Sequence, residues 1–215
     1  MGKVFIDNDN GIPQLACTGC GSCQSLMGKS FCSAVSRGCC HYFPEFNLAE
    51  IHRMLHLPGG RQVLQTILQH PGTVVNPFSI HAKGYFDRIS YEAYITGGQP
   101  LETGEIKDHT IFFRTCPFVE EGRGCKFPVR FRTTVCNFFI CSEILEKPGL
   151  HDLSEAYLEE RSRYSRWIHR ESTELQHILT ENGLNLVLDL ERSLELLSGL
   201  ALNEYEFPPL TPVEY

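Results

Sequence analysis

Residues 17–40 read CTGCGSCQSLMGKSFCSAVSRGCC and hold six of the ten cysteines in the chain. The stretch contains four glycines and several serines but no sustained hydrophobic period, so it predicts a loop rather than a helix or a strand. Glycine between cysteines allows the backbone to turn tightly around an ion. The segment therefore predicts that the fold is organised around a cysteine-rich core.

The spacing CxxCxxC at Cys17, Cys20 and Cys23 is the strongest local motif. Two intervening residues let neighbouring thiolates converge on tetrahedral zinc or on three corners of an iron–sulfur cluster. Three such cysteines in succession favour a 4Fe-4S cluster, because zinc sites more often combine one CxxC with a second, remote pair. Ordinary buried thiols and a disulfide knot are the alternative interpretations.

Cys39 and Cys40 are adjacent, so their side chains diverge and rarely bind one small ion together. We expect one ligand and one bystander, or one ligand in each of two sites, with Cys32 as a further candidate. A second group follows after about 75 residues without cysteine, and its members are Cys116, Cys125, Cys136 and Cys141. Two such remote groups predict that the fold brings them together, or that each group holds its own metal.

The second group lies in CPFVEEGRGCKFP from Cys116 and in RTTVCNFFIC from Arg132. With the CxxCxxC motif, it resembles the bacterial CxxCxxCC cysteine-cluster proteins of the YkgJ type, which are described as zinc- or iron-chelating. The resemblance spans about residues 17–57 and 110–141. It implies that the cysteines are metal ligands, at the matching positions Cys17, Cys20, Cys23, Cys116, Cys125 and Cys136. Cys141 falls where some members have a further cysteine.

The chain departs from the family pattern at Gln24, where the fourth N-terminal cysteine of the family would stand. The doublet appears instead at Cys39–Cys40, after an insertion rich in glycine and serine. Flagellin lysine methylases carry a related cluster, so the resemblance also implies a methyltransferase-like enzyme as a further alternative function.

The segments around the cysteines are basic, whereas the chain as a whole is acidic. The chain has 19 Lys+Arg and 26 Asp+Glu, for a net charge of -7, which argues against a general nucleic-acid binder. Residues 17–41 contain no Asp or Glu but include Lys29 and Arg37, and residues 114–141 are mostly basic among their charged residues. These cations either offset an anionic metal–thiolate centre or lie on solvated turns.

Histidines supply a few spare candidate ligands. His41 follows the cysteine doublet directly. His52 and His56 are spaced i, i+4 and share one face of a predicted helix. No HExxH motif accompanies them, so we expect these two to be exposed or hydrogen-bonded rather than ligating.

The middle of the chain predicts two helices and then strands. Asn47 and Glu50 predict a capping box that starts a helix, and a second short helix is expected near Arg61–Gln69, after Pro58-Gly59-Gly60. Residues 73–114 are rich in β-branched and aromatic residues and predict two to four strands. We interpret two segments of this region as extended, KGYFDRISYEAYI (83–95) and HTIFFRT (109–115). VEEGRG (119–124) predicts a tight turn that could place Cys116 and Cys125 side by side.

The C-terminal part predicts helices. Asp152 and Glu155 predict a capping box for a helix that reaches Asn182-Gly183. Asn185 predicts the start of another helix, which runs through Leu197. FPPLTPVEY (207–215) contains too many prolines for a helix and predicts an extended segment.

Together these patterns predict an α+β, mostly helical fold with a cysteine-rich metal-binding core, a small β element and C-terminal helices. We expect a cysteine-cluster metal-binding domain over 1–150 and a C-terminal helical extension over 151–215. The chain shows no apolar run of about 20 residues and no signal-peptide pattern after its first lysine. We therefore expect a cytoplasmic protein without a membrane partner, where clustered cysteines more often bind metal than form disulfides.

The predicted function is a cysteine-ligated metal centre. An iron–sulfur cluster with a redox or cluster-dependent role is favoured, and a zinc-binding interaction module without catalysis is the alternative. A redox partner, or a homodimer formed through the C-terminal helices, is the expected kind of partner. The predicted metal ligands are Cys17, Cys20, Cys23, Cys39, Cys40, Cys116, Cys125, Cys136 and Cys141.

Overall fold

The computed structural model describes residues 3–18, 25–32, 37–97, 106–141, 151–209 and 213–214, with the main chain alone at 3, 151–154 and 213–214. The fold is α+β, with about 47% helix and 18% strand, which confirms the predicted class and the excess of helix.

The chain divides into two compact units. Unit 1 comprises Met1–Cys17, Pro44–Ala82 and Phe127–Tyr215, and unit 2 comprises Thr18–Phe43 and Lys83–Lys126. The predicted boundary at residue 150 stays a prediction.

Unit 1 begins with a β-hairpin that the sequence analysis did not predict. Strands β1 (Lys3–Asp9) and β2 (Ile12–Cys17) pair antiparallel, with Asp9 opposite Ile12. The two turn residues both have positive φ, 50° at Asn10 and 75° at Gly11. This is the backbone that an Asn-Gly type I′ turn requires. On its other edge β1 pairs with β10 (Val213–Glu214), so the end of the proline-rich tail is extended as predicted.

The second sheet of unit 1 leads into its first helix. It has the strand order β3 (Glu45–Asn47), β5 (Ser79–Ala82), β4 (Thr73–Asn76). Helix α1 (Leu48–His56) follows β3 directly. The Asn47 side chain accepts the Glu50 N–H at 3.0 Å, and the Glu50 carboxylate accepts the Asn47 N–H at 3.0 Å, so the predicted capping box is confirmed. Helix α2 (Gly60–Gln69) is confirmed as well.

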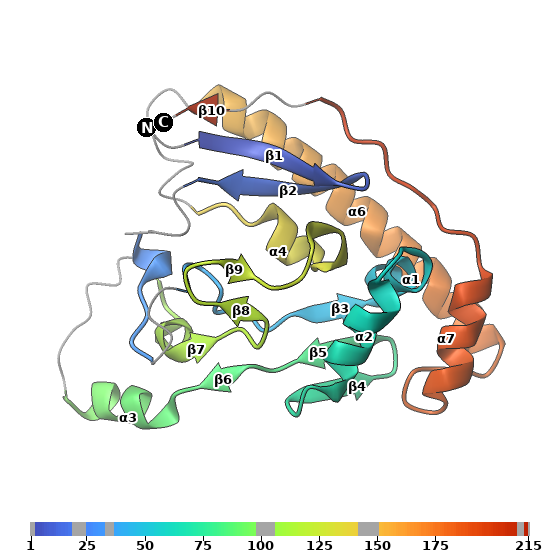
Figure 1. The fold of residues 1–215 in the computed structure, drawn as a ribbon, viewed down its shortest axis with the longest axis horizontal. Helices are drawn as coiled ribbons and strands as arrows, with labels where there is room; N and C mark the ends of the chain where they lie inside the picture. Colours follow the sequence, from blue (N-terminus) through green and yellow to red (C-terminus); the bar gives the residue numbers. More distant parts are fainter. Residues whose placement is uncertain are drawn as a thin grey trace. The chain divides into compact units, whose positions relative to one another are not determined.

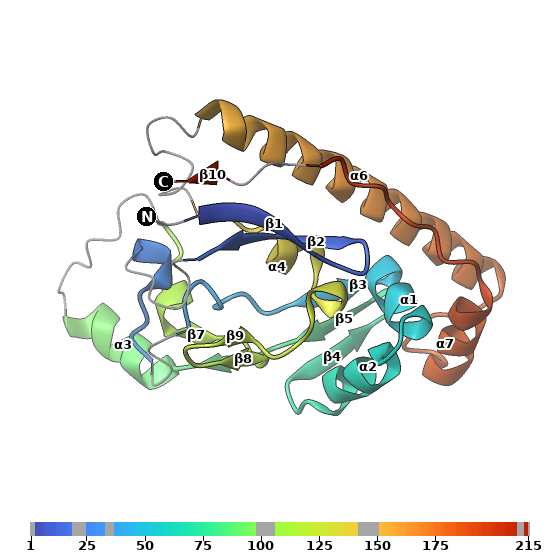
Figure 2. The same cartoon turned by 45° about the horizontal axis from the view of Figure 1, so that its top comes forward.

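Helix α1 lies at the centre of the unit 1 core, because every residue from Leu48 to Leu55 is buried. It packs against α2, α6 (His151–Glu181) and α7 (Leu190–Gly199), which gather around it in both views (Figures 1 and 2). Helix α6 presents a stripe of buried residues at helical spacing, which comprises Tyr157, Tyr164, Ile168, Leu175 and Leu179. This stripe therefore belongs to the core of unit 1.

The end of α6 is confirmed, whereas the predicted start of the next helix is wrong. Gly183, with φ of 67°, follows α6 directly and allows the chain to turn. The Asn185 carboxamide accepts the N–H groups of Val187 and Leu188 and so forms a turn before the helix. Helix α7 starts four residues later than expected, because Asp189 is its N-cap and accepts the Arg192 N–H at 3.0 Å.

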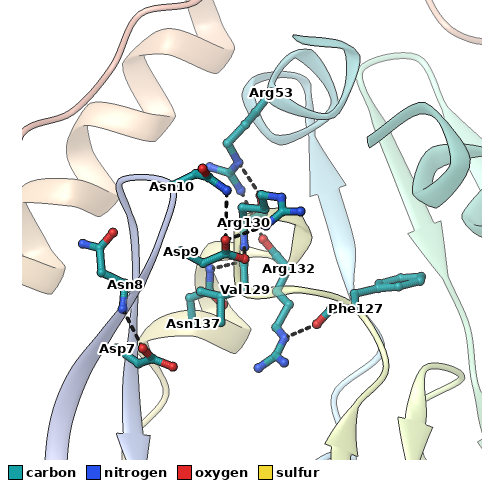
Figure 3. A network of polar contacts seen from close by, with 10 residues as sticks. All are labelled: Asp7, Asn8, Asp9, Asn10, Arg53, Phe127, Val129, Arg130, Arg132 and Asn137. Atoms are coloured by element: carbon teal, nitrogen blue, oxygen red, sulfur yellow. Dashed lines mark hydrogen bonds and ion pairs between the residues drawn. The ribbon is translucent and has the colours of Figure 1, made fainter. Parts of the chain in front are cut away.

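A network of polar contacts holds residues 127–138 within unit 1 (Figure 3). This segment contains a 3-10 helix, η4 (Val129–Phe131), and helix α4 (Thr134–Phe138). Arg130 forms an ion pair with Asp9 at the tip of the hairpin. Arg53 of α1 donates to the Arg130 carbonyl at 2.8 Å and to the Arg132 carbonyl at 3.2 Å. The hairpin and α1 therefore both fix this segment.

Unit 2 is built from short elements. Its sheets are the pairs β6–β7 and β8–β9. The bounds of its elements are η2 (Leu26–Gly28), β6 (Tyr85–Phe86), α3 (Arg88–Gly97), η3 (His109–Phe113), β7 (Arg114–Thr115), β8 (Val119–Glu120) and β9 (Gly124–Cys125). Phe112, Phe113 and Phe118 are its most deeply buried aromatic side chains.

The described residues between Thr73 and Thr115 include the strands β4 to β7, within the predicted two to four. The extended interpretation of the two unit 2 segments is confirmed only at β6 and β7 and is wrong for the rest, because aspartates cap helical turns there. Asp87 accepts both the N–H and the hydroxyl of Ser90, at 3.0 and 2.8 Å, so the chain enters α3 directly after β6. Asp108 accepts the Thr110 N–H at 3.1 Å and starts η3, which leaves only Arg114–Thr115 of that segment in a strand. Local capping bonds of this kind outweigh the weak β propensity of single residues.

In the part of the chain that the structure describes, no helix has the length and apolar character needed to cross a membrane.

Candidate metal centre

Main-chain hydrogen bonds in unit 2 join the segment of the cysteine doublet to the segment that leads into Cys116. The Cys116 N–H donates to the Cys40 carbonyl at 2.9 Å, so the first cysteine of the second group lies beside the doublet. The Phe31 N–H donates to the Phe112 carbonyl at 2.8 Å and joins the same two segments. The expectation that remote cysteines meet in space is confirmed for Cys40 and Cys116.

The cysteine doublet lies on a tight turn. The Cys40 N–H donates to the Arg37 carbonyl at 3.2 Å, and the His41 N–H donates to the Cys39 carbonyl at 2.8 Å. Gly38 adopts a φ of 55°, a left-handed conformation that glycine tolerates best. Cys39 and Cys40 are both half-buried. The turn thus presents two successive cysteines next to the start of the second group.

The predicted tight turn after Cys116 is confirmed as a small hairpin. β8 and β9 pair with Val119 opposite Cys125, and Gly122 and Gly124 supply the positive φ angles of the turn. The Val119 N–H donates to the Cys116 carbonyl at 3.3 Å, so Cys116 lies at the foot of this hairpin. The hairpin thus fixes the path of the chain from Cys116 to Cys125.

Arg37 is the most unusual buried side chain of this region, since it is only 2% exposed. Its guanidinium donates to three carbonyls, those of Gly38 at 2.7 Å, Lys29 at 3.0 Å and Ile111 at 2.8 Å. Burial lowers its pKa, while the thiol groups of Cys32, Cys39 and Cys40 act in the opposite direction. In the sequence, the signal that sets Arg37 apart is that it is the one arginine in a stretch, residues 17–41, without acidic residues.

Cys32 is buried and has two hydroxyl neighbours. Its Sγ lies 3.1 Å from the Ser30 Oγ and 3.0 Å from the Thr115 Oγ1, both within hydrogen-bonding distance. Thr115 directly precedes Cys116, so this contact is a further link between the two segments. No pattern in the sequence indicated the roles of Ser30 and Thr115.

His41 also lies in this region, and burial is the main reason why its pKa is lowered to about 4. The neighbouring cations Arg37 and Arg114 lower it further. The imidazole is therefore neutral at pH 7, the form that binds metal. Within the described part of the chain, the buried His41 Nδ1 and Arg37 Nε have no hydrogen-bond partner. These two nitrogens lie on either side of the doublet. Buried nitrogens of this kind are expected where a bound group supplies the missing partner.

Other basic residues near the cysteines have carboxylate partners. Arg114 lies 3.6 Å from Asp108, and Arg123 lies 3.7 Å from Glu120. Arg130 of unit 1 pairs with Asp9. These three arginines therefore differ from Arg37, whose guanidinium donates to main-chain carbonyls.

Three of the other predicted ligands belong to unit 1. Cys17 ends β2, where it pairs with Val4. Cys136 lies in α4, where its N–H donates to the Thr133 hydroxyl at 3.3 Å, and Cys141 follows that helix. Cys20 and Cys23 lie outside the described residues.

Contacts of the unit 1 network hold Cys136 in place. The Asn137 carboxamide donates to the Val129 carbonyl at 2.9 Å, and Arg132 donates to the Phe127 carbonyl at 2.8 Å (Figure 3). Arg132, which the family resemblance includes, thus has a structural role in this segment.

The histidine pair of α1 is hydrogen-bonded, as expected. The His56 Nδ1 donates to the His52 carbonyl at 3.0 Å, and the His52 Nε2 lies 3.4 Å from the Leu200 carbonyl. The two rings meet edge to face, with centroids 4.4 Å apart. His52 also lines a cavity of about 70 Å³ together with Trp167 and Tyr205.

Across the described ranges, no three Cys, His, Asp or Glu side chains gather closely enough to hold an ion. The metal-binding core of the predicted fold therefore stays a prediction. Comparisons of the chain with protein-family models, with curated proteins and with solved structures found no match.

Proposed function

We propose that the protein holds a cysteine-ligated metal centre in unit 2, of the kind suggested by the resemblance to the YkgJ-type proteins. The observation that carries this proposal is the hydrogen bond from the Cys116 N–H to the Cys40 carbonyl. It places the start of one cysteine motif beside the end of the other, which ordinary core packing does not require. Thiolate ligands from two remote segments are typical of structural zinc and iron–sulfur sites.

The proposed ligands in the described part of unit 2 are Cys116, Cys125 and one or both of Cys39 and Cys40. Cys20 and Cys23 join them on the strength of their CxxC spacing alone. Cys32 is left out, because two hydroxyls already surround its sulfur. For Cys17, Cys136 and Cys141, a ligand role stays a prediction from the sequence.

An iron–sulfur cluster is the favoured group, because the CxxCxxC spacing of the sequence, to which Cys20 and Cys23 belong, suits the corners of a cubane. When bound, such a cluster accepts and releases one electron, so the proposed role is redox or cluster-dependent. This role requires an electron-transfer partner and a reducing compartment such as the cytoplasm.

A zinc-binding interaction module is the second candidate. The β8–β9 hairpin favours it, since a tight hairpin between Cys116 and Cys125 is a usual way to present two thiolates to one zinc ion. In this case the metal stabilises unit 2 and performs no chemistry of its own.

The test is the metal content of protein purified without oxygen. Iron and acid-labile sulfide, with a brown colour that dithionite bleaches, would support the iron–sulfur cluster. A colourless protein with stoichiometric zinc would support the second candidate. Protein that contains neither metal, or whose cysteines are bonded to one another, would overturn the proposal.

Two substitutions test the assignment of ligands. Cys116→Ser should lower the metal content sharply, because the serine hydroxyl is a poor ligand for a soft site. Cys32→Ser is the matched control, since it also replaces a cysteine of unit 2, and metal should be retained. Loss of metal in both variants would show that Cys32 is also needed for metal binding. It would contradict the exclusion of Cys32 as a ligand but not the proposal of a metal centre.

A further inference from the structure

Arg37 is a buried cation whose charge needs compensation. Its side chain is among the largest fully buried ones in the structure. An isolated charge that is removed from water costs several kcal/mol unless an opposite charge lies nearby. Buried arginines are therefore normally paired with carboxylates.

No carboxylate supplies this pairing among the described residues. Among the residues that the structure describes, no Asp or Glu forms an ion pair with the guanidinium, and the sequence of residues 17–41 contains neither. The guanidinium donates to the carbonyls of Gly38, Lys29 and Ile111, which are dipoles without net charge, and it also hydrogen-bonds the Cys32 side chain. Arg114 and Arg123 of the same unit both have acidic partners, so the arrangement at Arg37 is not general.

The groups that favour the charged guanidinium are the thiol groups of Cys32, Cys39 and Cys40. A protonated thiol carries no charge, whereas a metal-bound thiolate is deprotonated. Four thiolates around Zn²⁺ or a [4Fe–4S]²⁺ core leave a net negative charge. A metal–thiolate centre at the doublet would therefore provide the missing counter-charge.

We propose that Arg37 is the positioning residue and buried counter-cation of the metal–thiolate centre, and this inference rests on the proposed function. The guanidinium has two tasks. It ties the cysteine segments together, because it donates both to Lys29 and to Ile111. It also offsets the negative charge of the thiolates that hold the metal.

This role has a consequence for the redox behaviour of a cluster. One-electron reduction adds a further negative charge to the centre, and a nearby buried cation stabilises the reduced form. Removal of the cation should therefore make reduction more difficult and shift the midpoint potential to more negative values. With zinc in the site, removal of the cation should weaken metal binding instead.

The test compares Arg37→Met, which removes the charge, with Arg37→Lys, which keeps it but cannot make all the carbonyl contacts. The affinity of each full-length protein for Co²⁺ is measured from thiolate charge-transfer absorption. If iron–sulfur protein is obtained, its midpoint potential is measured by titration with dithionite. Circular dichroism checks the fold of each variant.

We expect Arg37→Met to bind Co²⁺ about 10- to 100-fold more weakly than the wild type, the range found for outer-shell partners. Its cluster potential should be more negative. Arg37→Lys should recover most of the affinity and of the potential, because it restores the charge. If Arg37→Met does not fold, the lysine variant carries the test, and loss of metal in a folded Arg37→Lys protein would overturn the role of the charge.

The outcomes separate this inference from the proposed function. A wild-type protein that binds neither Co²⁺, zinc nor iron overturns both. A wild-type protein that binds metal, with an Arg37→Met variant of equal affinity and equal potential, overturns the role of Arg37 alone.

Discussion

The Arg53 guanidinium donates from Nη1 to the Tyr164 hydroxyl at 3.0 Å and so joins α1 to α6 inside unit 1. Both side chains are buried, at 5% and 1% exposure. Arg53 makes two more bonds to the carbonyls of Arg130 and Arg132, and it lies near the buried carboxylate of Glu50. One residue thus ties a helix to both a second helix and a loop.

Substitution of Arg53 by Met should lower the free energy of unfolding by about 3–5 kcal/mol, because it removes three hydrogen bonds that a charged, buried guanidinium donates. Tyr164→Phe is the matched control. It removes only one of the three bonds and should cost about 1 kcal/mol. Urea unfolding followed by circular dichroism measures both. Equal losses in the two variants would contradict the central role of Arg53.

Asp189→Ala should destabilise unit 1 by about 1 kcal/mol, because Asp189 caps the N-terminus of α7. Asp189→Asn is the control and should retain nearly full stability, since asparagine caps equally well. Thermal unfolding measures the difference. An unaffected alanine variant would argue that α7 does not start at Leu190.

Gly84→Ala should destabilise unit 2. A Cβ at this position would lie 2.1 Å from the Thr115 carbonyl oxygen, directly before Cys116, so the main chain would have to shift. Gly97→Ala in α3 is the control, because a Cβ there meets nothing within 4 Å. We expect weaker metal binding in the first variant and no loss in the second. Metal retention and stability unchanged in Gly84→Ala would show that β6 and β7 are not packed so closely.

The stability of unit 1 should fall as the pH drops below about 6.5. Burial is the main reason why the pKa of His52 is lowered, and His56 lowers it further, against the raising effects of Glu171 and the Leu200 carbonyl. The unfolded chain then binds a proton that the folded state does not, so the stabilisation is present above the unfolded pKa and is lost on acidification. Each such group contributes at most about 1.4 kcal/mol per pH unit.

Urea unfolding at pH 7.5 and at pH 5.5 measures this dependence. The difference between the two conditions should be smaller in His52→Gln than in the wild type. His177→Gln, on the exposed side of α6, is the control and should behave like the wild type. His41 belongs to unit 2 and adds a dependence of the same sign to the unfolding of the full-length protein, so the measured difference should shrink without vanishing. An unchanged difference in His52→Gln would contradict the assignment.

Local signals that act within one turn of helix were predictable from the sequence. Asn47 and Glu50 form a capping box that depends only on residues three apart, and the structure has it as predicted. The turn Asn10-Gly11 is a local signal of equal strength. It closes the β1–β2 hairpin, which was not among the predicted elements.

Where the prediction was wrong, a short polar side chain decided between two backbone conformations. Residues 88–97 and 109–113 are rich in residues that favour strands, yet Asp87 and Asp108 start helical turns there. Contacts such as that between Arg37 and Ile111 connect residues 74 apart. Their geometry depends on the completed fold, so sequence spacing alone could not reveal them.

The division of the chain also orders events during synthesis. The last residue of unit 2 is Lys126, whereas unit 1 needs residues up to the C-terminal segment. Once residue 126 has left the exit tunnel of the ribosome, all residues of unit 2 are available and the unit can fold. The buried face of α1 must wait for α6, and until then its apolar side chains are exposed to aggregation or to a chaperone.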